Sequence, residues 1–363
     1  MIRILAACSP GEVRVAAASG NTLMDYALWR PGRPDGVGDV FRGRVLAPVP
    51  ALGGAFVALL GADGFLPDQE GAAGLTEGAA VCVRVTRAAQ GGKGPRLTAR
   101  LPQTAGPPGL MQRGPGAVER LAARYPDAPV LADDPALVAS LRPALGVRLS
   151  VEAQVFDDGM AAQIEALASP DVALPGGARL SIHPTPALVA IDIDSGGTSA
   201  DRRPKQVAQM AANLALLPAL ARQIRLRNLS GAIVVDVAGL SMAKRAALGP
   251  GFTAALAGDP LRPRFLGITA LGLAEILRTR VHPPLHELLA GPHAAGLLAL
   301  RHIMQDAAAD PAAQFRLRAA PDVAAALDAD GVAQADLARR TGRPLVLHSD
   351  PTLPPGTYAI ERP

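Results

Sequence analysis

Two apolar stretches that end in carboxylates most constrain how this chain can fold. Residues 186–197 read PALVAIDIDSGG and residues 231–236 read GAIVVD. Continuous valine and isoleucine runs predict central strands that are buried on both faces. Asp192 and Asp194 end the first strand, and Asp236 ends the second. Because an ionised carboxylate at the end of a buried strand is costly without a partner, we expect the strand ends to share a divalent cation.

The order strand, helix, strand predicts that both acidic ends lie at one edge of a sheet. The helix is expected over residues 205–228, with Gly231 at its C′ position. The alternative is that Asp192 and Asp236 only cap helices or terminate strands. Around this unit the spacing of apolar residues predicts a hairpin partner at 174–184, helices at 242–256 and 271–280, and a strand at 264–270.

Residues 40–101 contain about five short strands between glycine turns, which predicts a small closed barrel of the oligonucleotide-binding type. Phe56 and Phe65 could stack against nucleic-acid bases on such a barrel. The alternative is that both phenylalanines belong to the barrel core and that the nearby cations form a solvated rim. The basic residues in question are Arg84, Arg87, Lys93, Arg96 and Arg100.

The other segments predict strands, connectors and helices. Residues 1–28 alternate like strands joined by tight turns, residues 29–39 and 101–116 are rich in proline and glycine, and the C-terminal part is expected to hold helices and a closing pair of strands. A hydrophobic content of 49% over 363 residues indicates a globular protein with more than one core. A net charge of +4 only mildly favours an anionic partner.

Cys8 and Cys82 are the only cysteines, and they lie far apart in the sequence. This usage favours a reducing compartment without a disulfide framework. The apolar run before Cys8 is too short for an export signal, and no stretch has the length of a membrane span. We therefore expect a soluble cytoplasmic protein without a membrane partner.

Several of these motifs together resemble the ribonuclease E/G family of single-strand-specific endoribonucleases. ALVAIDIDSG is similar to the strand that carries the family's metal site, and ARQIRLRNLSGAIVVD is similar to the helix and strand that follow it. Further similar segments are GGAFVALLGADGFLP and GGKGPRLTARL in the expected barrel, AQIEALASPDVALPGG before the acidic strand, and LGLAEILRTR after it.

The resemblance implies an α/β multidomain fold. An RNase H-like domain (residues 1–36 and 117–170) would be interrupted by an OB-fold RNA-binding barrel (37–101). Residues 102–116 would be a connector or the remnant of a reduced 5′ sensor. A DNase I-like α/β catalytic domain (171–290) and a small C-terminal αβ domain (291–363) would follow.

The resemblance also implies roles for single residues. Asp192 and Asp236 would be ligands of a catalytic Mg²⁺, and Asp194 would assist them in the place of a family asparagine, with Mn²⁺ as a possible alternative ion. Phe56, Phe65 and Lys93 would hold RNA. Among the nearby arginines, Arg96 and Arg113 are further candidates for RNA contact, although Arg113 is also typical of a solvent-exposed connector residue.

The chain departs from the family pattern at several positions. The cysteines of the family's zinc link are missing, so we expect neither a structural zinc nor a zinc-linked dimer, and a monomer or another homo-oligomer is possible. Scattered histidines are typical of surface or capping positions: His282, His286, His293 and His302. Gly114 replaces the threonine of the 5′ sensor, which predicts weak discrimination of 5′ ends. Gly239 and Ala270 replace an acid and an arginine near the expected active site.

Two functions follow from these observations. The first is a metal-dependent endoribonuclease that hydrolyses single-stranded RNA to 5′-phosphate and 3′-hydroxyl ends, in RNA processing or decay, and the resemblance alone implies a preference for AU-rich RNA. The second is an RNA-binding protein of the same family with reduced or lost hydrolysis, favoured by Gly239 and Ala270.

Overall fold

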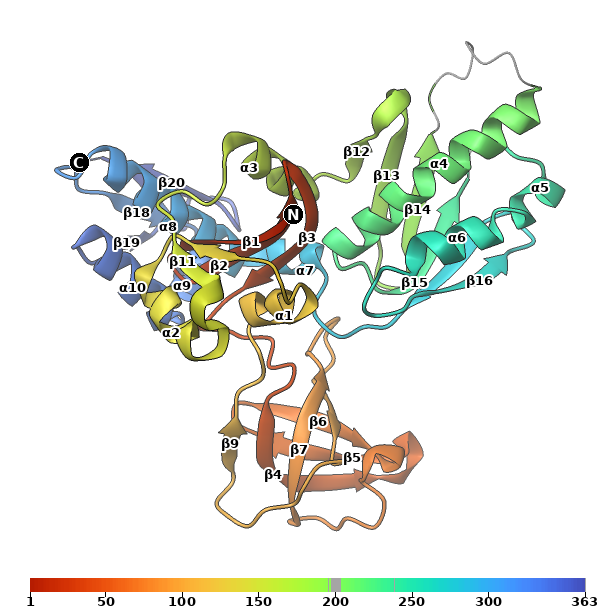
Figure 1. Ribbon diagram of the computed structural model, residues 1–363. Helices are drawn as coiled ribbons and strands as arrows, with labels where there is room; N and C mark the ends of the chain where they lie inside the picture. The colour runs from red at the N-terminus through yellow and green to blue at the C-terminus, as the bar shows by residue number, and fades with distance from the viewer. Residues whose placement is uncertain (195, 197–203, 238, 363) are drawn as a thin grey trace. The chain divides into compact units, whose positions relative to one another are not determined.

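The computed structural model describes residues 1–194, 196, 204–237 and 239–362, so the end of the stretch 186–197 lies partly outside the described residues. The chain forms two compact units. The first comprises residues 1–34, 117–277 and 284–363, and the second comprises residues 35–116 and 278–283. Both units combine β-sheet with helix or turn, as expected of an α/β multidomain protein (Figure 1).

The first unit begins with a sheet whose strand order is β11-β10-β1-β2-β3. The expected antiparallel turns near the N-terminus are confirmed, because β1 pairs with β2 and β2 pairs with β3. Helices α1 and α2 alternate with β10 and β11 in the chain, and α3 follows β11. The bounds are β1 (Ile2–Ser9), β2 (Glu12–Ser19), β3 (Thr22–Trp29), α1 (Ala117–Arg124), β10 (Val130–Ala132), α2 (Pro135–Leu145), β11 (Leu149–Val151) and α3 (Asp158–Glu165).

The stretches that end in carboxylates lie in a second sheet, here called the carboxylate sheet, with the order β12-β13-β14-β15-β17-β16. The expected parallel pair, β14 with β15, and the hairpin of β13 with β14 are confirmed. Its elements are β12 (Asp171–Ala173), β13 (Arg179–Pro184), β14 (Val189–Asp194), α4 (Lys205–Leu226), β15 (Gly231–Asp236), α5 (Met242–Ala246), α6 (Gly249–Leu256), β16 (Arg264–Ile268) and β17 (Ala274–Arg278).

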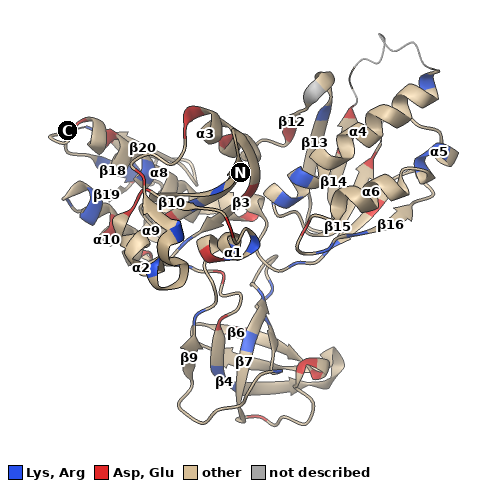
Figure 2. Ribbon diagram, in the orientation of Figure 1, with Lys and Arg blue, Asp and Glu red and all other residues tan. Residues whose placement is uncertain are grey.

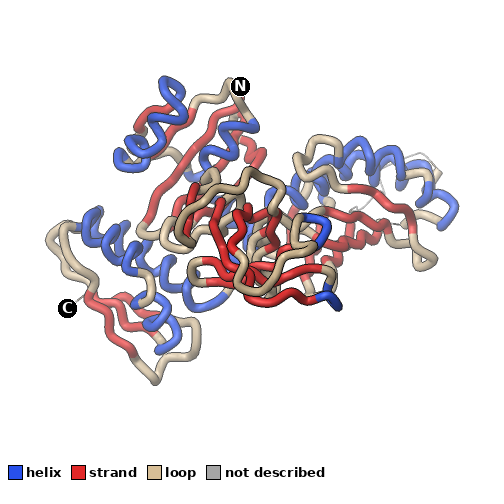
Figure 3. Tube along the Cα trace, turned by 90° about the horizontal axis from the view of Figure 1, so that it is seen from below, coloured by secondary structure: helices blue, strands red, loops and turns tan. Residues whose placement is uncertain are grey.

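One face of the carboxylate sheet is covered by α4 and α6 (Figures 1 and 3). Ile191 and Val235 of the sheet share a buried core with Leu217 of α4 and Phe252 of α6. Since side chains alternate between the faces of a strand, the residues between these buried positions point to the other face. This arrangement places the acidic residues of β14 and β15 away from the helices.

Three local expectations around this sheet are wrong. Residues 274–278 form β17 rather than a helix, because pairing with β16 and alternate burial of its side chains override the helical preference of LGLAEILR. The expected helix over 242–256 breaks into α5 and α6, since Pro250 lacks the N–H needed to continue a helix and instead starts a new one. Helix α4 ends with Asn228 in the left-handed region (φ +48°), a position expected for Gly231.

The second unit is built on a closed barrel of five strands in the order β5-β6-β8-β7-β4, and pairing of β4 with β5 closes it. The expected closed barrel is thus present. The structure adds β9, which lies within the expected connector 102–116 and pairs with β4. The bounds are β4 (Val40–Val49), β5 (Gly54–Leu59), β6 (Ala62–Pro67), β7 (Ala80–Arg87), β8 (Arg96–Thr98) and β9 (Gly109–Gln112).

The C-terminal part of the first unit packs α8, α9 and α10 against a sheet of order β19-β18-β20. The helices and the two closing strands expected in the C-terminal part are confirmed, and β18 and α10 are additional. The bounds are α7 (Leu285–Leu289), α8 (Gly291–Ala309), β18 (Arg316–Ala319), α9 (Pro321–Asp328), α10 (Gly331–Thr341), β19 (Val346–Ser349) and β20 (Tyr358–Glu361). Short 3₁₀ turns span Pro50–Leu52, Asp68–Glu70, Gly146–Arg148, Ala166–Ala168 and Pro175–Gly177.

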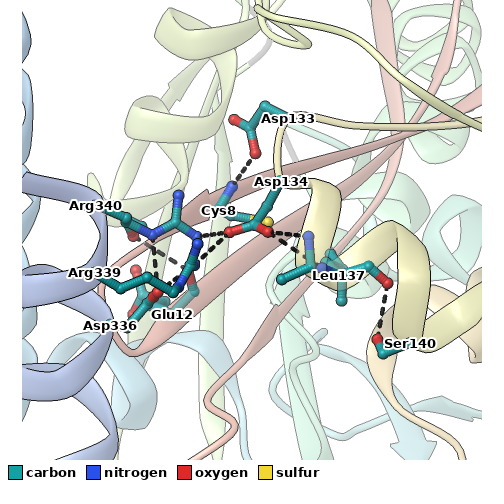
Figure 4. A network of polar contacts seen from close by, with 11 residues as sticks. Cys8, Glu12, Asp133, Asp134, Leu137, Ser140, Asp336, Arg339 and Arg340 are labelled. Atoms are coloured by element: carbon teal, nitrogen blue, oxygen red, sulfur yellow. Dashed lines mark hydrogen bonds and ion pairs between the residues drawn. The ribbon is translucent and has the colours of Figure 1, made fainter.

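A charged network links α10 to the N-terminal sheet of the same unit (Figure 4). Asp134 caps α2 through Ala136 N and also accepts hydrogen bonds from Arg339 and Arg340. Next to it, Cys8 N donates to Asp133 Oδ1 at 2.8 Å. Both cysteines are free and buried. Among the described helices, none has the length and apolar character needed to cross a bilayer.

Candidate functional site

Asp192 and Asp236 face each other across two neighbouring parallel strands. They are register partners at the ends of β14 and β15, and both are exposed. Neighbouring strands lie about 4.8 Å apart, and register partners point to the same face. The adjacent residues Ile191 and Val235 are 2% and 0% exposed, which anchors both strands to the core on the opposite face. The fold therefore places two solvent-exposed carboxylates side by side.

Asp194 lies two residues beyond Asp192 on β14 and is exposed on the same face. Its Oδ1 accepts a hydrogen bond from Gly196 N at 3.0 Å, and its register partner on β13 is Arg179. Within the described ranges, no three His, Cys, Asp or Glu side chains form a group able to hold a metal ion. A direct role of Asp194 as a third ligand stays a prediction, and the arrangement that the described residues form is a pair of carboxylates.

Arg245, which the sequence reasoning missed, binds one carboxylate of this pair. Its Nη1 donates to Asp236 Oδ1 at 2.8 Å and to Gly272 O at 2.7 Å, and its Nε donates to Leu240 O at 3.0 Å. The Arg245 side chain is 16% exposed, whereas Asp236 is 51% exposed. Three hydrogen bonds thus fix the guanidinium, and the guanidinium in turn fixes the orientation of Asp236.

In the sequence, the signal for Arg245 is a basic segment that follows the strand ending in Asp236. Lys244 and Arg245 come a few positions after Asp236, in the run SMAKRAAL. Such a run is typical of an exposed helix face, and nothing in its spacing distinguishes Lys244 from Arg245. The two short helices α5 and α6, which replace the single expected helix, place Arg245 in contact with the strand end.

Glutamine side chains contact the turn after β15, where Gly239 replaces an acid of the family pattern. Gln206 Nε2 donates to Gly239 O at 2.9 Å, and Gln206 Oε1 accepts from Ser241 N at 3.0 Å. Gly239 has a φ of +60°, and a Cβ added there would lie 2.0 Å from Gln209 Nε2. The space that a side chain at position 239 would need is therefore filled by Gln209.

Phe56 and Phe65 form an aromatic pair on adjacent strands of the barrel. They are register partners on β5 and β6, and their ring centroids lie 5.5 Å apart at an interplanar angle of 64°. The buried core of the barrel is made of other side chains, among them Val57 and Leu66, each 0% exposed. Phe56 is 37% exposed. The pair therefore lies outside the barrel core, as a stacking surface for bases requires.

Arg96 lies next to this aromatic pair in the barrel, and Lys93 is three residues before it in the chain. Arg96 on β8 is the register partner of Phe65, so Phe56, Phe65 and Arg96 form a row across three strands. Lys93 belongs to the turn before β8, where it exchanges backbone hydrogen bonds with Gln90. Basic residues on β4 and β7 add to the positive charge of the barrel (Figure 2). We call Phe56, Phe65, Lys93 and Arg96 the aromatic-basic row.

Arg113 lies outside this row, directly after β9. Its Nη1 donates to Asp39 Oδ2 at 2.7 Å, and Asp39 Oδ1 accepts from Gly114 N at the same distance. The carboxylate of Asp39 is buried, while the Arg113 side chain is 62% exposed. This ion pair gives Arg113 a structural partner and favours the connector interpretation over an RNA contact.

The histidines expected at surface or capping positions contact separate partners. His282 Nδ1 lies 2.6 Å from Asp35 Oδ2, and His293 Nε2 lies 2.8 Å from Asp330 Oδ2. Burial lowers the pKa of His293, and also that of His286. His302 Nδ1 lies 3.2 Å from the Tyr358 hydroxyl, so all four histidine positions are accounted for by separate partners or by burial.

Comparisons with known proteins converge on the part of the chain that contains the acidic strands. Residues 139–281 match the model of the Ribonuclease E/G family. Ribonuclease E of a Nostoc species is 35% identical over 128 residues, which cover 35% of this chain and 18% of that protein. Ribonuclease E of Escherichia coli K12 is 34% identical over 126 residues, covering 34% of this chain and 12% of that protein.

Ribonuclease G of Escherichia coli K12 is 31% identical over 119 residues, which cover 32% of this chain and 24% of that protein. In these three alignments the chain spans less than a quarter of the relative's own length. The resemblance noted from the sequence is confirmed over residues 139–281, which include Asp192, Asp236 and Arg245.

Proposed function

Since residues 139–281 of this chain match the ribonuclease E/G family, we propose that the protein is a metal-dependent endoribonuclease. Its substrate is single-stranded RNA, its products carry 5′-phosphate and 3′-hydroxyl ends, and its role lies in RNA processing or decay. The observation that carries this proposal is the register pairing of Asp192 with Asp236 on the exposed face of the carboxylate sheet.

The donor set of the acidic pair suits Mg²⁺. Asp192 and Asp236 offer hard carboxylate oxygens, and Mg²⁺ is commonly held by one or two carboxylates together with substrate phosphate and water. Both side chains are exposed at the strand ends and can approach a polyanionic substrate. When bound there, Mg²⁺ or Mn²⁺ neutralises charge on the phosphodiester and supplies a nucleophilic water.

Side chains of the protein orient the acidic pair and bind the RNA. Arg245 holds the carboxylate of Asp236 in one orientation, which limits the reorganisation needed at the acidic pair. In the barrel, the aromatic-basic row binds bases by stacking and the backbone by charge. Asp194 adds negative charge to the same face and would favour binding of a cation.

The domain assignment is part of the same proposal. We assign an RNase H-like domain to residues 1–36 and 117–170, an OB-fold to 37–101, a DNase I-like domain to 171–290 and a C-terminal domain to 291–363. We also assign the protein to the cytoplasm, without a structural zinc and without a zinc-linked dimer.

A second candidate is an RNA-binding protein of this family that has lost hydrolysis. The specific observation in its favour is the turn at Gly239, where Gln209 fills the space of a side chain and Gln206 holds the backbone. The acid that the family pattern has at position 239 is missing here. The amide of Gln209 occupies the space that its side chain would need. Binding of RNA through the barrel would not need that acid.

One experiment separates these two candidates. The purified full chain is incubated with single-stranded RNA labelled at either end, in the presence of Mg²⁺ or Mn²⁺, and the product ends are tested with phosphatase and polynucleotide kinase. Metal-dependent fragments with 5′-phosphate and 3′-hydroxyl ends support the endoribonuclease. Salt-sensitive binding without any fragment under either ion establishes the second candidate instead.

A further inference from the structure

Three arginines meet at the end of the barrel hairpin formed by β7 and β8. Arg87 and Arg96 are register partners on these strands. The segment 278–283, which belongs to the same compact unit, passes beside them, because Ala88 N donates to Val281 O at 2.8 Å. This segment carries Arg280. Burial, together with the positive charges of Arg96 and Arg280, lowers the pKa of Arg87.

This arginine cluster, defined as Arg87, Arg96 and Arg280, carries uncompensated charge. Within the part of the chain that the structure describes, none of the three side chains forms an ion pair with a carboxylate. Arg87 Nε is buried and has no hydrogen-bond acceptor among the described residues, and the same is true of Gln90 Nε2, three residues further along. Buried donors without acceptors are costly, and like charges repel, so an anion bound at the cluster would stabilise it.

The position of the cluster identifies the chemistry of that anion. Arg96 is flanked by Phe65 on β6 and by Arg87 on β7, so the row Phe56, Phe65, Arg96, Arg87 crosses four adjacent strands. A stacking surface next to a guanidinium cluster matches the repeat of a nucleic acid strand, in which each base is followed by a phosphate. Guanidinium groups bind the oxygens of phosphate in a bidentate manner.

We propose that Arg87, Arg96 and Arg280 form a subsite for an RNA backbone phosphate next to the base that stacks on Phe56 and Phe65. This inference rests on the proposed function, because it takes RNA as the substrate. Arg280 lies two residues after the end of β17 in the chain, so one arginine of the subsite comes from the segment that continues from the carboxylate sheet.

The test measures the binding of a short fluorescent poly-U RNA by the full chain in EDTA, over a series of KCl concentrations. Each lost phosphate contact lowers the slope of log K against log salt by about 0.7 for a single strand. We expect this change for Arg87→Gln and for Arg280→Gln, with about tenfold weaker binding at low salt. Arg280 is exposed, so its substitution leaves folding intact even if that of Arg87 does not.

Arg44→Gln is the matched control, because it removes one exposed charge from β4 of the same barrel, beside Ala58 and Ala80. Slopes for the Arg87 and Arg280 variants equal to that of the control overturn the inference. Cleavage by the unmodified chain in Mg²⁺ is assayed in parallel. If the unmodified chain cleaves RNA but the Arg87 and Arg280 variants keep its salt slope, only the phosphate subsite is rejected. If the salt slopes change but the unmodified chain does not cleave, the subsite is supported and the endoribonuclease is rejected.

Discussion

Arg245 Nη1 lies 2.8 Å from Asp236 Oδ1, at the end of the strand whose register partner residue is Asp192. The contact joins α5, which follows the acidic strand, to the strand end itself. The same nitrogen donates to Gly272 O, in the turn between β16 and β17. A single side chain thus connects three segments around the exposed carboxylates.

Asp192→Asn and Asp236→Asn are each expected to reduce RNA cleavage by at least about 100-fold, because the amide removes the charge that binds a divalent cation. Both residues are exposed, so thermal unfolding should change little. The matched control is Asp171→Asn on β12 of the same sheet, where the Ser181 hydroxyl donates to Oδ1 and can equally donate to an amide oxygen. Cleavage at the unmodified rate by either variant contradicts the assignment of the acidic pair.

Arg245→Ala is expected to lower the cleavage rate about tenfold, since Asp236 loses the donor that orients it. It should also lower the free energy of unfolding by about 1–2 kcal/mol, because Gly272 O and Leu240 O lose hydrogen bonds from a charged donor. Arg245→Lys retains the charge and should recover part of the rate. The binding of Mn²⁺, followed by electron paramagnetic resonance, separates a positioning role from a purely structural one: unchanged affinity in Arg245→Ala argues for the structural role.

Phe56→Ala and Phe65→Ala are expected to weaken the binding of single-stranded RNA by about 1–3 kcal/mol each, the range for loss of one base–aromatic stack. Fluorescence anisotropy in EDTA measures this without cleavage. Leu60→Ala is the control, because Leu60 is 69% exposed in the turn between β5 and β6 and is also a large apolar residue of the barrel. If all three variants lose affinity equally, the aromatic pair has no specific role.

Stability should decrease below neutral pH because of His293. Burial lowers the pKa of this side chain from its ordinary value of 6.5, although the carboxylate of Asp330 opposes the shift and Arg33 and Arg30 add to it. The unfolded chain therefore takes up a proton first as the pH falls through 6.5, which favours unfolding. One such group limits the slope to about 1.4 kcal/mol per pH unit.

Urea midpoints at a series of pH values check this expectation, and His293→Gln should flatten part of the dependence. Because burial also lowers the pKa of His286, some dependence should persist in that variant. A midpoint that rises as the pH falls from neutral to mildly acidic contradicts the predicted sign.

The expectations for the two acidic strands, the helix between them and the barrel, which depended on local pattern, agree with the structure. The apolar runs at 189–193 and 231–235 became β14 and β15, and the helix between them became α4, because buried strands and a crossover helix impose hydrophobic patterns that neighbouring residues already display. The barrel strands were visible for the same reason. LGLAEILR, by contrast, has a helical composition, and only its pairing with β16 made residues 274–278 a strand.

The sequence by itself determined the acidic strands, the helix between them, the barrel strands and the family resemblance, since each depends on residue types at short spacing. Only the tertiary structure decided that Asp192 and Asp236 are register partners and that Arg245 binds Asp236. It also decided that Phe56 and Phe65 lie outside the barrel core, next to Arg96. The physical reason is that register, exposure and ion pairing depend on residues far apart in the chain, and composition and periodicity contain no information about which of them meet.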